Sequence, residues 1–248
     1  MSNPITEHHL PDERQLAQAL AQDIAQRLST AVAERGGALL AVSGGKSPVA
    51  LFQALATQAL LVPAWPHITV LLVDERCVPP EHADSNARLV HEHLLQGPAA
   101  VARWVPLAAG EGWGSNGAAF PPDVMRLRLA AEARLAPLAW PLDVAVLGMG
   151  LDGHTASFFP GAPGLGEALA TPARCAWVLP DPVLNKAQHA RLTLSLSTLL
   201  GARHLCLPLS GSAKQAVYAQ ARSGPSEELP VSLLLCQRQA PVAVWLSP

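Results

Sequence analysis

The first pattern in the chain is a run of apolar residues at helical spacing. Within residues 12–37, apolar side chains recur every four positions and polar ones fill most of the gaps, the apolar set being Leu16, Leu20, Ile24, Leu28 and Val32. Asp12 and Gln15 have the spacing of a capping box, and Gly36 and Gly37 follow where such a helix would stop. The pattern predicts one long amphipathic helix.

Short apolar runs, typical of buried strands, alternate with further helical segments. We expect strands at residues 38–42, 68–73, 103–107, 143–147, 176–179, 190–196, 204–209 and 242–246, and helices at residues 48–61, 85–95, 123–135 and 212–221. A Gly-rich loop is predicted at 110–117. The alternation predicts an α/β protein with a mainly parallel sheet flanked by helices on both faces, a Rossmann-like architecture, with residues 1–248 in a single domain.

Charge and composition narrow the classes of function. The chain has 17 Lys and Arg against 19 Asp and Glu, a net charge of −2, which gives no basic surface for a nucleic acid backbone. No apolar run approaches the roughly 20 residues that cross a bilayer, and the polar start of the chain does not resemble an export signal. We expect a cytoplasmic protein with no nucleic acid or membrane partner. The four cysteines form no C-x-x-C pair and are expected to be ordinary buried thiols.

A glycine-rich turn follows the strand predicted at 38–42. Two glycines allow a sharp bend, and the helix that comes next would point its N–H groups and the positive end of its dipole into the turn. Ser47 is placed as the N-cap of that helix and Pro48 as its first residue. The turn lacks the full spacing of a nucleotide P-loop. We interpret it as a phosphate-binding loop, with an ordinary strand-to-helix turn as the alternative; its residues are Ser43, Gly44, Gly45 and Lys46.

A similar arrangement occurs at residues 210–214, again between an apolar strand and a helix. Ser212 and Gln215 have the spacing of a capping box, and Lys214 lies in the first helical turn. The helix dipole disfavours a cation at this position unless an anion offsets it. A bound phosphate would supply that anion. The alternative is a solvated lysine that extends away from the helix.

Three consecutive charged residues follow the strand predicted at 68–73. They are Asp74, Glu75 and Arg76. Arg76 is suited to bind a phosphate through two N–H groups, while Asp74 would meet a hydroxyl or a histidine. An ion-pair cluster at the rim of the sheet explains the same residues equally well.

The segment 148–153 spells G-x-G-x-x-G after a predicted strand. A dinucleotide site would need an uninterrupted helix afterwards, but prolines and glycines break the chain at 159–164. We therefore reject that site and expect the glycines to expose Asp152 and His154 on a tight loop. Histidine suits acid and base chemistry near neutral pH, and a flanking carboxylate can fix its tautomer.

A metal site is not expected. The triplet at 91–93, His-Glu-His, superficially suggests one. Residues two apart on a helix do not share a face, however, and the spacing fits no zinc-protease motif.

Taken together, these segments are similar to the 6-phosphogluconolactonase family of the sugar-phosphate isomerase and deaminase-like superfamily. The resemblance covers nearly the whole chain and is most specific at 148–161; the supporting segments are 43–48, 74–76 with 84–86, 191–194 and 211–214. The loop at 185–190 departs from the proline-rich approach of the relatives.

The resemblance implies a glucosamine-6-phosphate deaminase-like fold and a function. The expected reaction is the hydrolysis of 6-phosphoglucono-1,5-lactone to 6-phosphogluconate in the oxidative pentose phosphate pathway, with no metal or organic cofactor. His154 would be the general base, with Asp152 and Asp74 in the catalytic group. The substrate phosphate would be held by Ser43, Gly44, Gly45, Lys46, Arg76, Arg191 and Lys214. A sugar phosphate is the expected partner, in a monomer or small homo-oligomer.

Two alternatives remain. Glucosamine-6-phosphate deaminases continue after the histidine with a segment that supplies a carboxylate, and residues 155–160 here contain none. A sugar-phosphate-binding regulator could keep the pocket and lose catalysis. The presence of His154 argues against a regulator, but only an assay separates the two.

Overall fold

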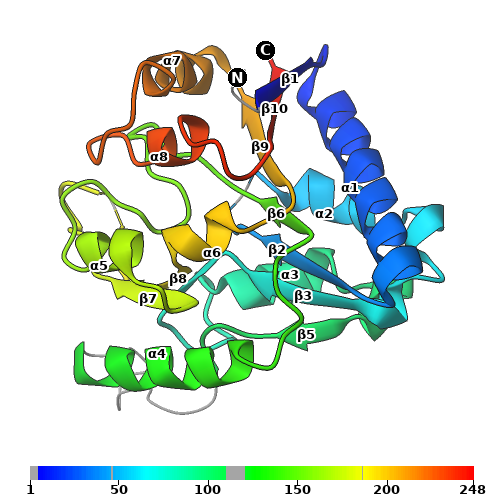
Figure 1. Cartoon of the computed structure of the whole chain (residues 1–248), viewed down its shortest axis with the longest axis horizontal. Helices are drawn as coiled ribbons and strands as arrows, with labels where there is room; N and C mark the ends of the chain where they lie inside the picture. Colours follow the sequence, from blue (N-terminus) through cyan, green and yellow to red (C-terminus); the bar gives the residue numbers. More distant parts are fainter. Residues whose placement is uncertain (1–4, 46, 110–120, 186) are drawn as a thin grey trace.

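The computed structural model describes residues 5–45, 47–109, 121–185 and 187–248 (Figure 1). Lys46, Lys186 and the Gly-rich loop predicted at 110–117 lie outside the described residues. Apolar side chains from both ends of the chain, from Leu16 to Leu246, join one continuous hydrophobic cluster. The fold is therefore held together by contacts between segments far apart in the sequence.

A seven-stranded sheet forms the centre, and all of its neighbouring strands are parallel. In spatial order the strands are β1 (Ile5–His9), β10 (Val242–Ser247), β9 (Leu205–Ser210), β6 (Val144–Val146), β2 (Ala38–Val42), β3 (Ile68–Leu72) and β5 (Arg103–Val105). The sequence did not predict β1, because most of its residues are polar. As an edge strand it needs only backbone pairing with β10 on one side.

Helices cover both faces of this sheet, which confirms the predicted fold class (Figure 1). Within the described residues, no helix has the length and apolar character needed to cross a membrane. The longer helices are α1 (Glu13–Arg35), α2 (Val49–Ala56), α3 (Asn86–His93), α4 (Pro121–Leu135) and α7 (Ser212–Ala221). The shorter ones are α5 (Leu165–Ala170), α6 (Leu196–Leu200) and α8 (Val231–Leu235), with 3-10 turns at Ala59–Leu61, Trp65–His67 and Gly97–Val101.

A second sheet of three antiparallel strands was not predicted. Its order is β4 (Asp74–Arg76), β8 (Arg191–Leu194) and β7 (Cys175–Val178). The strands expected near 176–179 and 190–196 exist, but they belong to this sheet and not to the parallel one. Because the chain passes from β3 through Val73 directly into β4, the charged triplet is a strand of its own. Its pairing places Arg76 opposite Arg191.

The helix boundaries follow the predicted caps only in part. At α1, Asp12 accepts the amide of Gln15 at 2.7 Å, and Gly36 ends the helix with a φ of 75°. Ser47 does not cap α2, whose N-cap is Pro48. That helix ends at Ala56 and not near residue 61, and the Thr57 hydroxyl binds carbonyls of its last turn.

The capping box predicted at the start of α7 is also wrong. Gly211 is the N-cap, with a φ of 91°, and Ser212 lies inside the helix. The Gln215 side chain donates instead to the carbonyl of Ser247 at 2.8 Å. The side-chain amide of Gln215 therefore connects α7 to the end of β10 by a hydrogen bond.

Candidate active site

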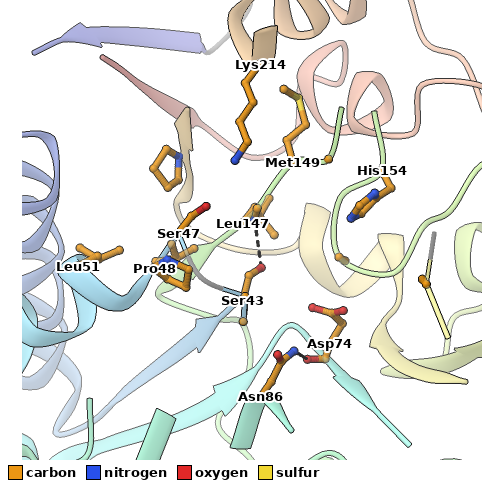
Figure 2. Close-up of a pocket in the computed structure, with 18 of the residues that line it drawn as sticks. Ser43, Ser47, Pro48, Leu51, Asp74, Asn86, Leu147, Met149, His154 and Lys214 are labelled. Atoms are coloured by element: carbon orange, nitrogen blue, oxygen red, sulfur yellow. Dashed lines mark hydrogen bonds between the residues drawn. The ribbon is translucent and has the colours of Figure 1, made fainter. Parts of the chain in front are cut away.

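The polar motifs of the sequence meet in one cavity at the carboxyl ends of the central strands. The cavity has a volume of about 880 Å³ and is bordered by segments that follow β2, β3, β6 and β9 (Figure 2). Ligands of parallel α/β sheets bind at this edge. Asp152 touches the cavity only through its contact with His154. The predicted site residues that line it are Ser43, Gly44, Gly45, Asp74, Arg76, His154, Arg191 and Lys214.

Glycines shape the loop that carries His154. The amide of Gly150 donates to the carbonyl of His154 at 2.9 Å, and the amide of Gly153 donates to the carbonyl of Gly150 at 3.1 Å. A Cβ at residue 150 would overlap with the imidazole of His154 and the carboxylate of Asp152. Gly153 has a φ of 76°, a conformation that favours glycine. The glycine pattern therefore makes a tight turn that presents the histidine.

The imidazole of His154 is paired with the carboxylate of Asp152. Nδ1 of His154 lies 2.5 Å from Oδ1 of Asp152, and the two side chains are 30% and 33% exposed. Burial by itself would raise the pKa of Asp152, but the hydrogen bond and positive charge of His154 outweigh it and hold that pKa below its usual 3.8. An ionised carboxylate accepts the proton of Nδ1, so the lone pair lies on Nε2. The His154 ring points into the cavity (Figure 2).

An aromatic ring that the sequence reasoning missed lies between His154 and Arg191. The ring centroids of Phe159 and His154 are 4.5 Å apart, and the Cζ of Arg191 lies 5.9 Å from the Phe159 centroid. Phe159 is buried and lines the cavity. Its position within the specific motif at 148–161 was a signal that could have identified it. Phe159 therefore packs against both the histidine and the arginine.

Arg191 is a buried cation with an unsatisfied donor. Arg191 is 6% exposed, and its Nη1 has no hydrogen-bond partner among the described residues. Burial and the neighbouring Arg76 lower the pKa of Arg191 to about 10, against the opposing effect of the Asp74 carboxylate. The guanidinium therefore stays charged at neutral pH. Arg76 lies opposite it and donates to the carbonyl of Asp84 at 2.7 Å. Two adjacent cations, one with an unfilled donor, make this end of the cavity suited to an anion.

Asp74 contacts a hydroxyl and not a histidine. Its Oδ2 accepts the hydroxyl proton of Ser157 at 2.6 Å, and its backbone carbonyl accepts Nδ2 of Asn86 at 2.9 Å. The Oδ1 of Asn86 is buried and has no donor among the described residues. Asn86 lines the cavity beside Gly44. A Cβ at residue 44 would overlap with the side-chain amide of Asn86. Ser157 and Asn86 belong to the family segments at 148–161 and 84–86, but the sequence did not assign them to the site.

The ion-pair cluster considered for the charged triplet does not form among the described residues. Glu75 is buried, with 2% exposure, and its carboxylate accepts the amides of Arg76, Asn86 and Ala87 at 2.7, 2.8 and 2.7 Å. Burial raises the pKa of Glu75, while these backbone donors oppose the rise. Glu75 thus anchors the first turn of α3 and does not enter the cavity lining.

Lys214 extends from the first turn of α7 toward Ser43 and Ser47 (Figure 2). It forms no ion pair with a carboxylate of the described chain, and it lines the cavity. The Ser43 hydroxyl accepts the amide of Gly148 at 3.2 Å, which joins the two glycine loops. The cavity therefore has one cation, Lys214, near Ser43 and another, Arg191, beside Phe159.

Comparison with known proteins identifies the family of this chain. Residues 11–245 match the family described as glucosamine-6-phosphate isomerases/6-phosphogluconolactonase. The chain belongs to this family. It is similar to the 6-phosphogluconolactonase of Rhizobium meliloti, with 43% identity over 97% of this chain and 98% of the relative. It is also similar to that of Neisseria meningitidis serogroup A, with 40% identity over 92% of this chain and 93% of the relative.

Solved structures of family members have the same fold. A 6-phosphogluconolactonase from Shewanella baltica matches with a TM-score of 0.87 and 37% identity, covering 98% of each chain. The 6-phosphogluconolactonase from Trypanosoma brucei matches with a TM-score of 0.85 and 25% identity, covering 99% of this chain and 97% of that one. A monomeric glucosamine-6-phosphate deaminase, at 19% identity and a TM-score of 0.69, shares the fold alone. The chain is thus an enzyme of this family with the deaminase-like fold.

Proposed function

We propose that the protein hydrolyses 6-phosphoglucono-1,5-lactone to 6-phosphogluconate in the oxidative pentose phosphate pathway, and that it does so in the cytoplasm. The observation that carries the proposal is His154, which is paired with Asp152 and lines a cavity that also contains a buried arginine with an unfilled donor. The names of the full-length relatives support the same reaction.

The histidine supplies the proton transfers that lactone hydrolysis needs. Nε2 of His154 takes a proton from water as its oxygen attacks the C1 carbonyl and forms a tetrahedral intermediate. The bond from C1 to the ring oxygen then breaks, and the imidazolium returns the proton to that oxygen, which leaves the open-chain acid. Such a group contributes about 10²- to 10⁴-fold to the rate. Water and side chains suffice for every step.

Asp152 has a supporting role in this scheme. Its carboxylate holds the proton on Nδ1 and stabilises the positive charge that develops on the ring during the attack. Asp74 is bound to Ser157 and faces the cavity, where we assign it to the hydroxyl groups of the sugar and not to proton transfer to the histidine.

Cationic groups hold the phosphate and so position the carbonyl against His154. Arg76 and Arg191 provide guanidinium donors, and the turn at 43–45 and Lys214 add backbone amides and an ammonium group to the same cavity. Binding energy from the phosphate end of the substrate is used to orient the carbonyl at the other end.

The test is the rate of 6-phosphogluconate formation from freshly generated lactone, with spontaneous hydrolysis subtracted. We expect His154→Gln to lower kcat by about 10²-fold or more and to leave the affinity for 6-phosphogluconate nearly unchanged. His67→Gln is the matched control, because His67 is exposed and precedes β3 at the opposite edge of the sheet. Wild-type turnover in the His154 variant would refute the mechanism. No acceleration by the wild type, with 6-phosphogluconate still bound, would favour the sugar-phosphate regulator.

A further inference from the structure

A cluster of two histidines and one aspartate lies outside the machinery described above. His82 and Asp84 are in the loop between β4 and α3, and His189 precedes β8, more than 100 residues later in the chain. Among the described residues this is the one group of three side chains whose nitrogen and oxygen atoms approach as metal ligands would. The triplet at 91–93 forms no such group.

The distances within the cluster bracket those of a metal site. Nε2 of His189 lies 2.8 Å from Oδ2 of Asp84, and Nδ1 of His82 lies 3.9 Å from the same oxygen. Zinc binds imidazole nitrogen and carboxylate oxygen at about 2.0–2.2 Å, so tetrahedral ligands lie roughly 3.3 Å apart. One ligand atom from each of the three residues lies within 4.8 Å of the other two. Nδ1 of His82 also accepts the backbone amide of Asp84 at 3.1 Å, so a bound ion would replace this hydrogen bond and the contact between Asp84 and His189.

The cluster is accessible and lies beside the cationic end of the cavity. The side chains of His82, Asp84 and His189 are 43%, 56% and 23% exposed, so an ion can reach them from solvent. Asp84 and His189 line the cavity, and the backbone carbonyl of Asp84 accepts Nη1 of Arg76. An ion held here would sit at the rim, next to the guanidinium group of Arg76.

We propose that His82, Asp84 and His189 bind a divalent transition-metal ion, zinc first, and that the bound ion slows the enzyme. Two imidazoles and a carboxylate suit zinc, and three protein ligands leave a fourth position open. A phosphate oxygen can fill that position. The phosphate then lies at the rim and not on the inner guanidinium of Arg191, so the carbonyl is displaced from His154. This second effect rests on the proposed function, whereas metal binding does not.

Binding is tested on the full-length protein by zinc competition with a chromophoric chelator, and by the visible spectrum of added cobalt(II). We expect one tight equivalent in the wild type, and His82→Gln, Asp84→Asn and His189→Gln each to weaken it by at least about 10- to 100-fold, the loss typical of disturbing a metal site. His67→Gln should bind like the wild type. Absence of a tight equivalent, or affinity unchanged in all three variants, would mean that the cluster is only a hydrogen-bonded contact between two loops and would overturn the proposal.

The effect on turnover is tested with His82→Gln, because His82 does not line the cavity. Zinc at a concentration that saturates the site should slow lactone hydrolysis by the wild type and leave His82→Gln as fast as without metal. Equal inhibition of both proteins, or none of the wild type, would overturn the regulatory part. If the wild type does not hydrolyse the lactone at all, the proposed function fails, while the competition experiment still decides whether the metal site exists.

Discussion

At the residue scale, the short hydrogen bond between Asp152 and His154 determines the chemistry available in this cavity. Asp152 does not line the cavity, yet it fixes the proton of His154 on Nδ1. We expect Asp152→Asn to lower kcat by about 10- to 100-fold, because a neutral amide neither holds the tautomer nor stabilises the imidazolium. KM should change little. Steady-state kinetics decide the matter, and a rise in KM with an unchanged kcat would contradict this role.

The same pair makes a pH-dependent contribution to stability. The folded-state pKa of Asp152 lies below its usual 3.8, so the stability that the pair contributes is present above that value and is lost as the pH falls through the folded-state pKa. The difference in unfolding free energy between the wild type and Asp152→Asn should be constant near neutral pH and shrink below 3.8. Urea unfolding at several pH values measures it. A difference that grows on acidification would reverse the sign of the argument.

Residue 44 must be glycine because the side chain of Asn86 occupies the space beside it. A Cβ there would overlap with the buried amide of Asn86, which also donates to the carbonyl of Asp74. Gly44→Ala should displace Asn86, lower the unfolding free energy by about 1–3 kcal/mol for the lost buried hydrogen bond, and raise KM. The control is Gly166→Ala in α5, where a Cβ meets nothing within 4 Å. Equal stability of the two variants would show that the site tolerates the methyl group.

At the scale of elements, the first turn of α3 depends on a carboxylate from a neighbouring strand. Glu75 of β4 accepts two amides of that turn as well as the amide of Arg76. Glu75→Gln replaces one acceptor oxygen with an NH₂ group that cannot accept these protons. We expect a loss of about 2–4 kcal/mol in unfolding free energy. Glu92→Gln, on the exposed face of the same helix, should cost less than about 0.5 kcal/mol. Similar losses for both would mean that Glu75 does not anchor α3.

For the whole molecule, the cavity links segments from most of the sheet, so a ligand that fills it should stabilise the entire fold. At 100 times its Kd, 6-phosphogluconate should add about 2.7 kcal/mol, which corresponds to roughly 5–10 °C in Tm for a chain of this length. Arg191→Met should abolish most of this gain, because it removes the buried guanidinium. Thermal denaturation with and without ligand measures both. Full stabilisation of the variant would place the phosphate elsewhere.

Local sequence predicted most of the elements, because helical and strand periodicities and glycine turns are properties of neighbouring residues. The apolar spacing from Leu16 to Val32 predicted α1. The predicted strands of the parallel sheet, other than β1, lie close to the observed residue ranges. The four polar motifs were predicted at the carboxyl ends of these strands, where the structure brings them together. The strand β1 was missed because its residues are polar and only pairing with β10 makes them a strand. The caps at Ser47 and Ser212 were wrong because the flanking backbone, and not the side chain, determined where each helix begins.

The sequence by itself determined the α/β class, the glycine loops, and the choice of His154, Asp152 and the arginines as candidate residues. Only the tertiary structure decided that β4, β7 and β8 form a separate sheet that pairs Arg76 with Arg191, that Glu75 supports α3, and that His189 meets Asp84. The reason is physical. Periodicity and turn preference act over a few residues, whereas strand register, burial and the approach of charged groups depend on segments that become neighbours only when the hydrophobic core closes.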